Sequence, residues 1–163
     1  MIVYVTKGNV PSSLPRRAIE RTAAEVTRAL KAKASGTDRL ISVAFVTPRV
    51  MATYNSAYRG KPTATDVLSF EAMPGSRTFP VPATATEGKE QGDLIICPSY
   101  ARAEARKRGV PLDEELVRLL VHGTLHLFGY DHERIADERV MFAIQESVVQ
   151  QLMHVPAKKR TRI

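Results

Sequence analysis

The sequence predicts a single α+β domain, in which a mixed sheet of about four strands packs against about five helices. Short runs rich in β-branched residues alternate with longer segments whose apolar residues recur at the helical period. The chain has 163 residues without an internal repeat or interdomain linker, and this length suits one domain. We expect residues 1–154 to form the domain and residues 155–163 to form a basic C-terminal tail.

Four short segments are rich in β-forming residues and bounded by turn residues, which is typical of strands. They cover residues 2–5, 40–46, 66–70 and 93–97. Asp66 is expected to begin the third strand. The segment 71–92 between the third and fourth strands is rich in Pro, Gly, Thr and Ala and is too long for a tight hairpin. We therefore expect it to form an exposed loop.

Five segments carry helix signals at their ends or along one face. They cover residues from about 14 to 33, 48–58, 98–108, 111–128 and about 134–152. Ser12 or Ser13 is expected to cap the first helix. Pro111 stands in the first turn of the fourth, where the acidic residues that follow suit the positive end of the helix dipole.

Charge and cysteine content narrow the classes of function. The formal net charge is +7, so the surface would attract a polyanion such as nucleic acid, although a solvated basic surface has the same charge. Cys97 is the only cysteine, and we expect it to be a small buried hydrophobe and not a ligand. No internal disulfide can form, which favours a reduced cytoplasmic protein. We see no signal-peptide pattern and no apolar run long enough to span a membrane.

Three of the four histidines lie close together in His122-Gly-Thr-Leu-His126-Leu-Phe-Gly-Tyr-Asp-His132. The first two stand four apart in a predicted helix, so both imidazoles project from one face. Gly129 ends that helix and lets the backbone turn, which can bring His132 towards the other two. Three nitrogen ligands with an open fourth position are typical of catalytic zinc, although nickel, copper or iron also suit these donors. The alternative is that His126 is a core histidine whose ring nitrogens are hydrogen-bonded and that His132 lies on the surface. His154 lies outside the cluster.

The spacing is similar to the zinc-protease pattern His-Glu-x-x-His-x-x-Gly-x-x-His, so we expect a zincin-like metal helix. Gly123 occupies the position of the glutamate that acts as general base in those proteases. Because glycine cannot take up a proton, the pattern argues against a peptidase. A glycine inside a helix costs about 1 kcal/mol relative to alanine. We therefore expect a strand or the substrate to approach the backbone closely at Gly123.

The histidine motif resembles the signature of the YbeY family, bacterial metal-dependent endoribonucleases of ribosomal RNA maturation. Two further segments agree with that family. They are Asn55-Ser-Ala-Tyr-Arg59-Gly-Lys61-Pro-Thr-Ala-Thr-Asp66-Val-Leu-Ser-Phe70 and Gly92-Asp-Leu-Ile-Ile96. The resemblance covers residues 40–150, and the segment 71–91 is longer than the family usually carries.

The resemblance implies one zinc ion bound by His122, His126 and His132. It also implies cleavage of single-stranded RNA, maturation of the 3′ end of 16S ribosomal RNA, ribosome quality control and contact with the small ribosomal subunit. Neither spacing nor charge supplies these substrate details, and the oligomeric state stays open. Two other functions also remain open: a metallopeptidase, and a ribosome-assembly factor whose metal only holds the fold.

Hydrolysis of a phosphodiester needs an activated nucleophile and a cation near the phosphoryl oxygens, and bound zinc can supply the first. We expect Arg59 to supply the second, because a guanidinium matches phosphate oxygens bidentately, and Lys61 is a weaker candidate. Asp131 and Glu133 flank the last histidine. Either could orient an imidazole or act as an acid or base, and Asp131 could equally serve only to form the turn.

Overall fold

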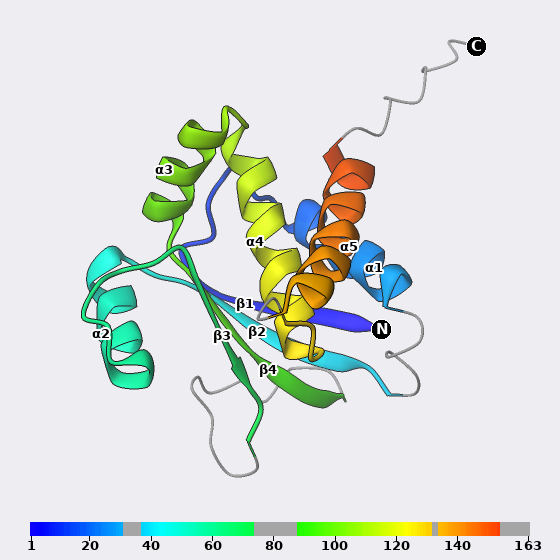
Figure 1. The fold of residues 1–163 in the computed structure, drawn as a ribbon, viewed down its shortest axis with the longest axis horizontal. Coiled ribbons are helices and arrows are strands. Elements are labelled where there is room, and N and C mark those ends of the chain that lie inside the picture. Colours follow the sequence, from blue (N-terminus) through cyan, green and yellow to red (C-terminus); the bar gives the residue numbers. More distant parts are fainter. Residues whose placement is uncertain (31–36, 74–87, 132–133, 154–163) are drawn as a thin grey trace.

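The computed structural model describes residues 1–30, 37–73, 88–131 and 134–153, which form the predicted α+β arrangement of a mixed sheet and helices (Figure 1). The strands are β1 (Ile2–Gly8), β2 (Arg39–Phe45), β3 (Val67–Glu71) and β4 (Lys89–Ile96). The helices are α1 (Arg16–Ala29), α2 (Pro48–Arg59), α3 (Pro98–Arg108), α4 (Leu112–Leu127) and α5 (Ile135–Met153). None of the helices in this part of the chain is long and apolar enough to cross a membrane.

The four strands form one sheet in the order β1-β2-β4-β3. β1 runs parallel to β2, and β2 runs parallel to β4. β3 pairs antiparallel with β4, from Val67 opposite Ile96 to Glu71 opposite Gly92. A Cβ at Gly92 would collide with the carbonyl oxygen of Phe70, so only glycine fits this close pairing. Because β3 is last in the strand order, it is an edge strand that pairs with β4 on one side only.

Alternate residues of β4 pack on opposite faces of the sheet, as the two-residue period of a strand requires. Leu94 and Ile96 belong to the larger core, which also contains residues of α1, α4 and α5. Ile95 and Cys97 belong to a smaller core with Met51 of α2. Figure 1 shows this division, with α2 on the opposite side of the sheet from α4 and α5. Cys97 is fully buried, as predicted.

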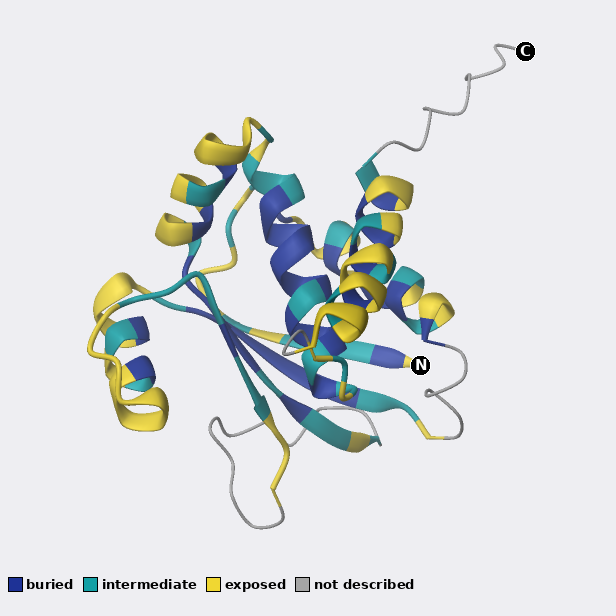
Figure 2. Cartoon of the chain, viewed as in Figure 1, coloured by how far each residue is buried: buried dark blue, intermediate teal, exposed yellow. Residues whose placement is uncertain are grey.

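α4 is the central helix of the larger core. Eleven of its sixteen residues are buried, and Figure 2 shows them as an almost continuous dark stripe. The helix follows Pro111 and carries three acidic residues in its first turn, which agrees with the predicted start. Among the described helices α4 has the largest share of buried residues, so the side chains near its C-terminal end stand on a firmly packed helix.

The predicted start of the first helix is wrong. α1 begins at Arg16 after Pro15, and no side chain caps it. Ser12 and Ser13 instead belong to a turn that carries Leu14 into the core, where it is fully buried. Burial of one apolar side chain therefore outweighs the capping tendency of the two serines.

The predicted loop 71–92 is too long at both ends, because β3 includes Glu71 and β4 begins at Lys89. β4 carries a bulge at Gln91, where two neighbouring residues of β2 pair with Glu90 and Gly92. Polar residues have weak β propensity, so pairing with β2, and not local sequence, sets this strand start. The rest of the loop, 74–87, and the tail, 154–163, lie outside the described residues.

Candidate metal centre

His122 and His126 lie one turn apart near the C-terminal end of α4, and their rings meet edge to face. The two Nε2 atoms are 3.1 Å apart, and the ring planes make an angle of 81°. The prediction that both imidazoles share one helix face is confirmed. This spacing suits an N–H···N hydrogen bond between the rings. It also allows both nitrogens to lie about 2.0–2.1 Å from a single zinc ion, so the donor pair fits a metal.

The chain turns back directly after the histidine helix. Gly129 has φ +79°, its N–H donates to the carbonyl of His126 at 2.9 Å, and the N–H of Tyr130 donates to the carbonyl of Leu125 at 3.0 Å. These two bonds form a Schellman motif, which glycine favours because of its positive φ. The predicted helix end is confirmed. The turn brings Asp131 to the same pocket as both histidines.

The third predicted ligand, His132, lies outside the described residues, as do Glu133 and His154. Among the residues that are described, no group of three His, Cys, Asp or Glu side chains is arranged to hold a metal. His132 follows Asp131 directly in the chain. Its role as a ligand therefore stays a prediction that the position of Asp131 supports.

A pocket of about 500 Å³ lies between the end of α2, the edge strand β3 and the histidine face of α4. Its lining residues are Arg59, Thr65, Asp66, Val67, Ser69, His122, Gly123, His126 and Asp131. A second pocket, of about 330 Å³, shares Ser69, His126 and Asp131 with it. Arg59 is thus brought to the histidine pair from a distant part of the sequence. Lys61, the weaker candidate, is not among the lining residues of either pocket.

The backbone around Arg59 is held by hydrogen bonds. Gly60 ends α2 with φ +66°, and the N–H of Lys61 donates to the carbonyl of Asn55 at 3.3 Å. The buried side-chain amide of Asn55 donates to the carbonyl of Thr63 at 2.7 Å. The segment after α2 is therefore hydrogen-bonded back to the helix, which fixes the position of the Arg59 backbone at the helix end.

Asp66 has a structural role and also lines the pocket. Its carboxylate accepts the N–H of Val67 at 2.8 Å and the hydroxyl of Thr65 at 3.0 Å. Its carbonyl accepts the N–H of Cys97 at 2.8 Å. β3 begins one residue after Asp66, close to the predicted start. The sequence did not mark Thr65 or Ser69 as pocket residues, because nothing in their type or spacing separates them from other loop and strand hydroxyls.

The helix position occupied by glutamate in zinc proteases faces the sheet in this protein. A Cβ at Gly123 would lie 2.6 Å from Cδ2 of Leu94, a fully buried residue of β4. The expected close approach to Gly123 is therefore made by a strand. Any side chain at this position would place its Cβ against the core at Leu94. Packing alone therefore explains why the residue is glycine, and no catalytic role is needed.

Replacing Gly123 with alanine is expected to destabilise the fold by about 1 kcal/mol. Overpacking in a core costs about 1–3 kcal/mol, and the gain in helix propensity returns only about 1 kcal/mol. In a Leu94→Ala chain the same replacement is expected to be stabilising, because the space beside Cβ is then open. Urea unfolding of the four proteins measures the coupling. Equal effects of Gly123→Ala in both chains would contradict the packing explanation.

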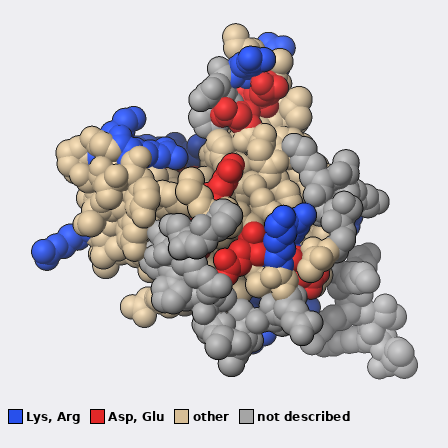
Figure 3. Space-filling view, turned by 90° about the horizontal axis from the view of Figure 1, so that it is seen from below, with Lys and Arg blue, Asp and Glu red and all other residues tan. Residues whose placement is uncertain are grey.

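Basic and acidic side chains are distributed unevenly on the underside of the described part of the molecule, the face seen in Figure 3. Figure 3 shows basic side chains reaching out on the α2 side of the molecule, whereas acidic and basic side chains lie close together elsewhere on this face. α2 ends on Arg59, which is exposed. The basic α2 side and the histidine pocket therefore adjoin each other.

Comparisons with known proteins agree on one family. The family model "Endoribonuclease YbeY" matches residues 6–153. A relative of that name from Bdellovibrio bacteriovorus is 32% identical over 155 residues, which are 94% of this chain and 94% of the relative. Another, from Rhodococcus opacus, is 39% identical over 113 residues, which are 67% of this chain and 61% of the relative.

A solution structure of a protein from Thermotoga maritima has a similar fold. The TM-score is 0.55 at 22% sequence identity, and the match covers 99% of this chain and 100% of that one. The fold and the pocket define a single-domain α+β protein with a histidine-bearing helix packed against the sheet. The family matches make the assignment specific: the chain belongs to the endoribonuclease YbeY family.

Proposed function

We propose that this protein is a metal-dependent endoribonuclease that hydrolyses single-stranded RNA, with one zinc ion held by His122, His126 and His132. One observation carries the proposal. His122 and His126, whose Nε2 atoms lie 3.1 Å apart, line the same pocket of about 500 Å³ as Arg59. Family membership supports it, because the family model and the relatives are named as endoribonucleases.

Zinc bound there would supply Lewis acidity and activate a water molecule for attack on phosphorus. The guanidinium of Arg59 donates two N–H bonds to the non-bridging oxygens of the scissile phosphate. These bonds orient the phosphate towards the histidine side and stabilise the charge that develops in the transition state. Asp131, which lines the same pocket, takes up and returns the proton that hydrolysis releases and consumes.

An aromatic group next to Arg59 supports a single-stranded substrate. Tyr58 is 58% exposed and stacks on Tyr54 with 6.3 Å between ring centroids, and its ring lies 4.7 Å from that of Phe70. Unpaired bases stack on such rings with about 1–3 kcal/mol each, whereas bases inside a duplex already stack on each other. Burial, followed by the effects of Tyr58 and Asp93, raises the pKa of Tyr54, so its hydroxyl stays neutral.

Within this proposal the substrate is the 3′ end of 16S ribosomal RNA, cut during maturation and ribosome quality control in the cytoplasm. The small ribosomal subunit is then the partner that presents the RNA. Membership of an endoribonuclease family supports an RNA substrate, and the resemblance of the histidine motif to that family implies this particular RNA and partner. The formal net charge of +7 supports binding to RNA, because lysine and arginine attract the phosphate backbone.

Arg59→Glu is expected to lower kcat/KM for single-stranded RNA by at least about 100-fold, because the new carboxylate repels the phosphate. Arg59→Lys is expected to lose about tenfold, since it keeps the charge but not the bidentate geometry. Arg59 is exposed at the end of α2, so zinc content and melting temperature should stay unchanged. Cleavage of a labelled RNA, alone and as a duplex, is measured beside metal analysis and thermal melting.

Four outcomes test the proposed function and its alternatives. Wild-type cleavage rates in Arg59→Glu would overturn the role of Arg59. Cleavage of a peptide library by the zinc-loaded protein would favour a metallopeptidase. If no RNA is cut and a chelator lowers the melting temperature sharply, the protein is an assembly factor with a structural metal. Cleavage that chelation stops in a still-folded protein supports the endoribonuclease.

A further inference from the structure

His122 is held from behind by α5. Its Nδ1 atom lies 2.9 Å from Oε1 of Gln145, and its ring stacks near that of Phe142, with 6.3 Å between centroids and 26° between planes. Nδ1 is the ring nitrogen that does not face His126, whose Nε2 contacts Nε2 of His122. One helix therefore supplies both the ring nitrogen contact and the packing contact of His122.

The side-chain amide of Gln145 has only one orientation that satisfies its neighbours. Its Nε2 lies 2.9 Å from Oε1 of Glu146, and a carboxylate can only accept hydrogen bonds. The NH₂ group must therefore face Glu146, and the amide oxygen must face His122. An amide oxygen also only accepts, so Nδ1 of His122 must carry the hydrogen.

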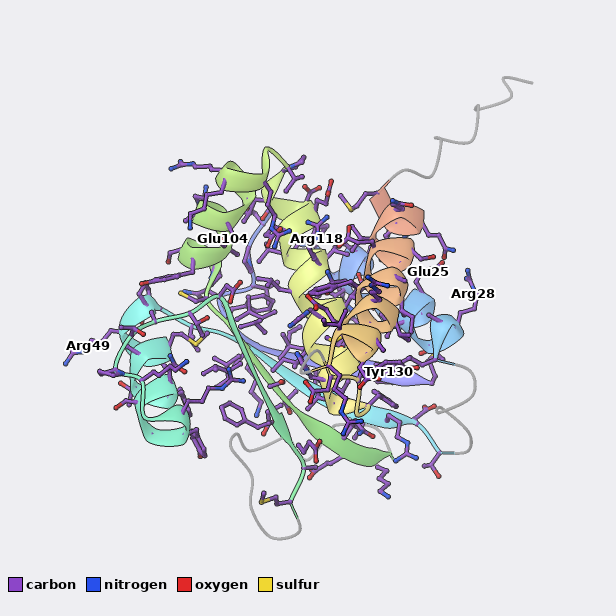
Figure 4. All side chains as sticks on the ribbon, in the orientation of Figure 1. Glu25, Arg28, Arg49, Glu104, Arg118 and Tyr130 are labelled. Atoms are coloured by element: carbon purple, nitrogen blue, oxygen red, sulfur yellow. The ribbon has the colours of Figure 1, made fainter. Side chains whose placement is uncertain are left out.

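Glu146 is itself fixed by Arg118 of α4. Nε and Nη2 of Arg118 donate to its two carboxylate oxygens at 3.0 and 3.3 Å. Gln145 is 4% exposed and Arg118 is 7% exposed, so their ends of these bonds are shielded from water, whereas the side chain of Glu146 is 43% exposed. Figure 4 shows Arg118 on the first half of α4, beside α5. The chain of bonds runs from a buried arginine to one imidazole of the candidate metal centre.

We propose that Gln145 is a positioning residue, which fixes the tautomer and ring orientation of His122 so that its Nε2 lone pair is directed at the metal. This inference rests on the proposed metal site. Imidazole ligands of metals commonly donate their other N–H to an oxygen acceptor, and loss of that acceptor lowers metal affinity 10- to 100-fold. Glu146 and Arg118 act one step further out, by preventing the amide of Gln145 from turning over.

Gln145→Leu tests the hydrogen bond while keeping a side chain of similar size. Zinc affinity, measured by competition with a chelator, is expected to fall about 10- to 100-fold. In metal-free protein at about pH 8, where an ordinary imidazole is neutral, ¹⁵N NMR should show wild-type His122 as the Nδ1–H tautomer. That preference should be lost in Gln145→Leu. Gln145→Glu combined with Glu146→Gln keeps an acceptor for Nδ1 and a donor–acceptor pair between the two side chains, and should restore both the tautomer and the affinity.

Two further variants separate positioning from packing. Val148→Ala removes buried volume from α5 and should lower the melting temperature without changing zinc affinity or the tautomer. Glu146→Gln lets the amide of Gln145 turn over, and it should give an affinity between those of wild type and Gln145→Leu.

The results also separate this inference from the proposed function. If the wild-type protein binds no zinc, the metal site fails, while the tautomer measurement still decides whether Gln145 orients His122. If wild type binds zinc, but Gln145→Leu keeps its affinity and tautomer, the positioning role is overturned and the metal site stands. An equal loss of affinity in Val148→Ala would also overturn it.

Discussion

Replacing His126 with alanine is expected to lower zinc affinity by more than about 100-fold and to abolish cleavage of single-stranded RNA. Loss of a group that merely orients a ligand already costs 10- to 100-fold in metal affinity, so loss of a ligand itself costs more. His126 is only half-buried on α4, and alanine has the highest helix propensity, so the fold should survive. Chelator competition, RNA cleavage and circular dichroism measure the three quantities.

The other histidines provide matched comparisons for His126→Ala. His132→Ala is expected to cause the same loss of zinc and cleavage, which tests the third ligand directly. His154 lies outside the His-x₃-His-x₅-His spacing, so His154→Ala is expected to behave as wild type. Cleavage that persists in His126→Ala, or disappears equally in His154→Ala, would contradict the assignment of the metal centre.

The geometry of the histidine pair could be predicted because it depends on neighbouring residues alone. A spacing of four in a helix places His122 and His126 on one face, whatever packs around them. The turn at Gly129 is equally local, since its two hydrogen bonds join residues no more than five apart. Gly123 was informative for the same reason, because an unfavourable residue inside a helix indicates a close neighbour.

The hydrogen bond from His122 to Gln145 could not be predicted, because it depends on how α4 packs against α5. The two residues are 23 apart in sequence, and Gln145 lies in a segment with no motif. Arg118 likewise contacts Glu146, 28 residues away, and in the sequence it resembles any other charged helix residue. Long-range polar contacts follow from tertiary packing, which residue types alone do not encode locally.

Arg118 is the centre of a partly buried charge cluster that joins α4 to α5. It donates to Glu114 and Glu115 one turn before it on α4 and to Glu146 on α5, and the side chain of Glu115 is only 2% exposed. Burial lowers the pKa of Arg118, but the bonds to Glu146 and Glu114 outweigh burial and raise it. Burial raises the pKa of Glu146, but bonds from Arg118 and Gln145 outweigh it and lower it.

Arg118→Met is expected to destabilise the fold by about 3–5 kcal/mol at neutral pH, because it leaves the buried carboxylate of Glu115 without its main partner. For a chain of this length that corresponds to a fall in melting temperature of roughly 10 °C. Adding Glu115→Leu should recover much of the loss, since an apolar pair needs no charge compensation. Thermal and urea unfolding measure both effects.

The pH dependence of Arg118→Met provides a sharper test than one melting temperature. Glu146 has a lowered pKa in the fold, so its contribution to stability is complete above its ordinary value of 4.5 and is lost as the pH falls through the lowered folded pKa. The variant lacks this contribution, because its Glu146 has lost the bonds from Arg118. The stability difference between the two proteins should therefore narrow on acidification. Lys107→Met, which breaks the exposed pair with Glu104, should leave the melting temperature unchanged at every pH. A stability difference that stays constant down to acid pH would show that Arg118 acts through the packing of its side chain and not through its charge.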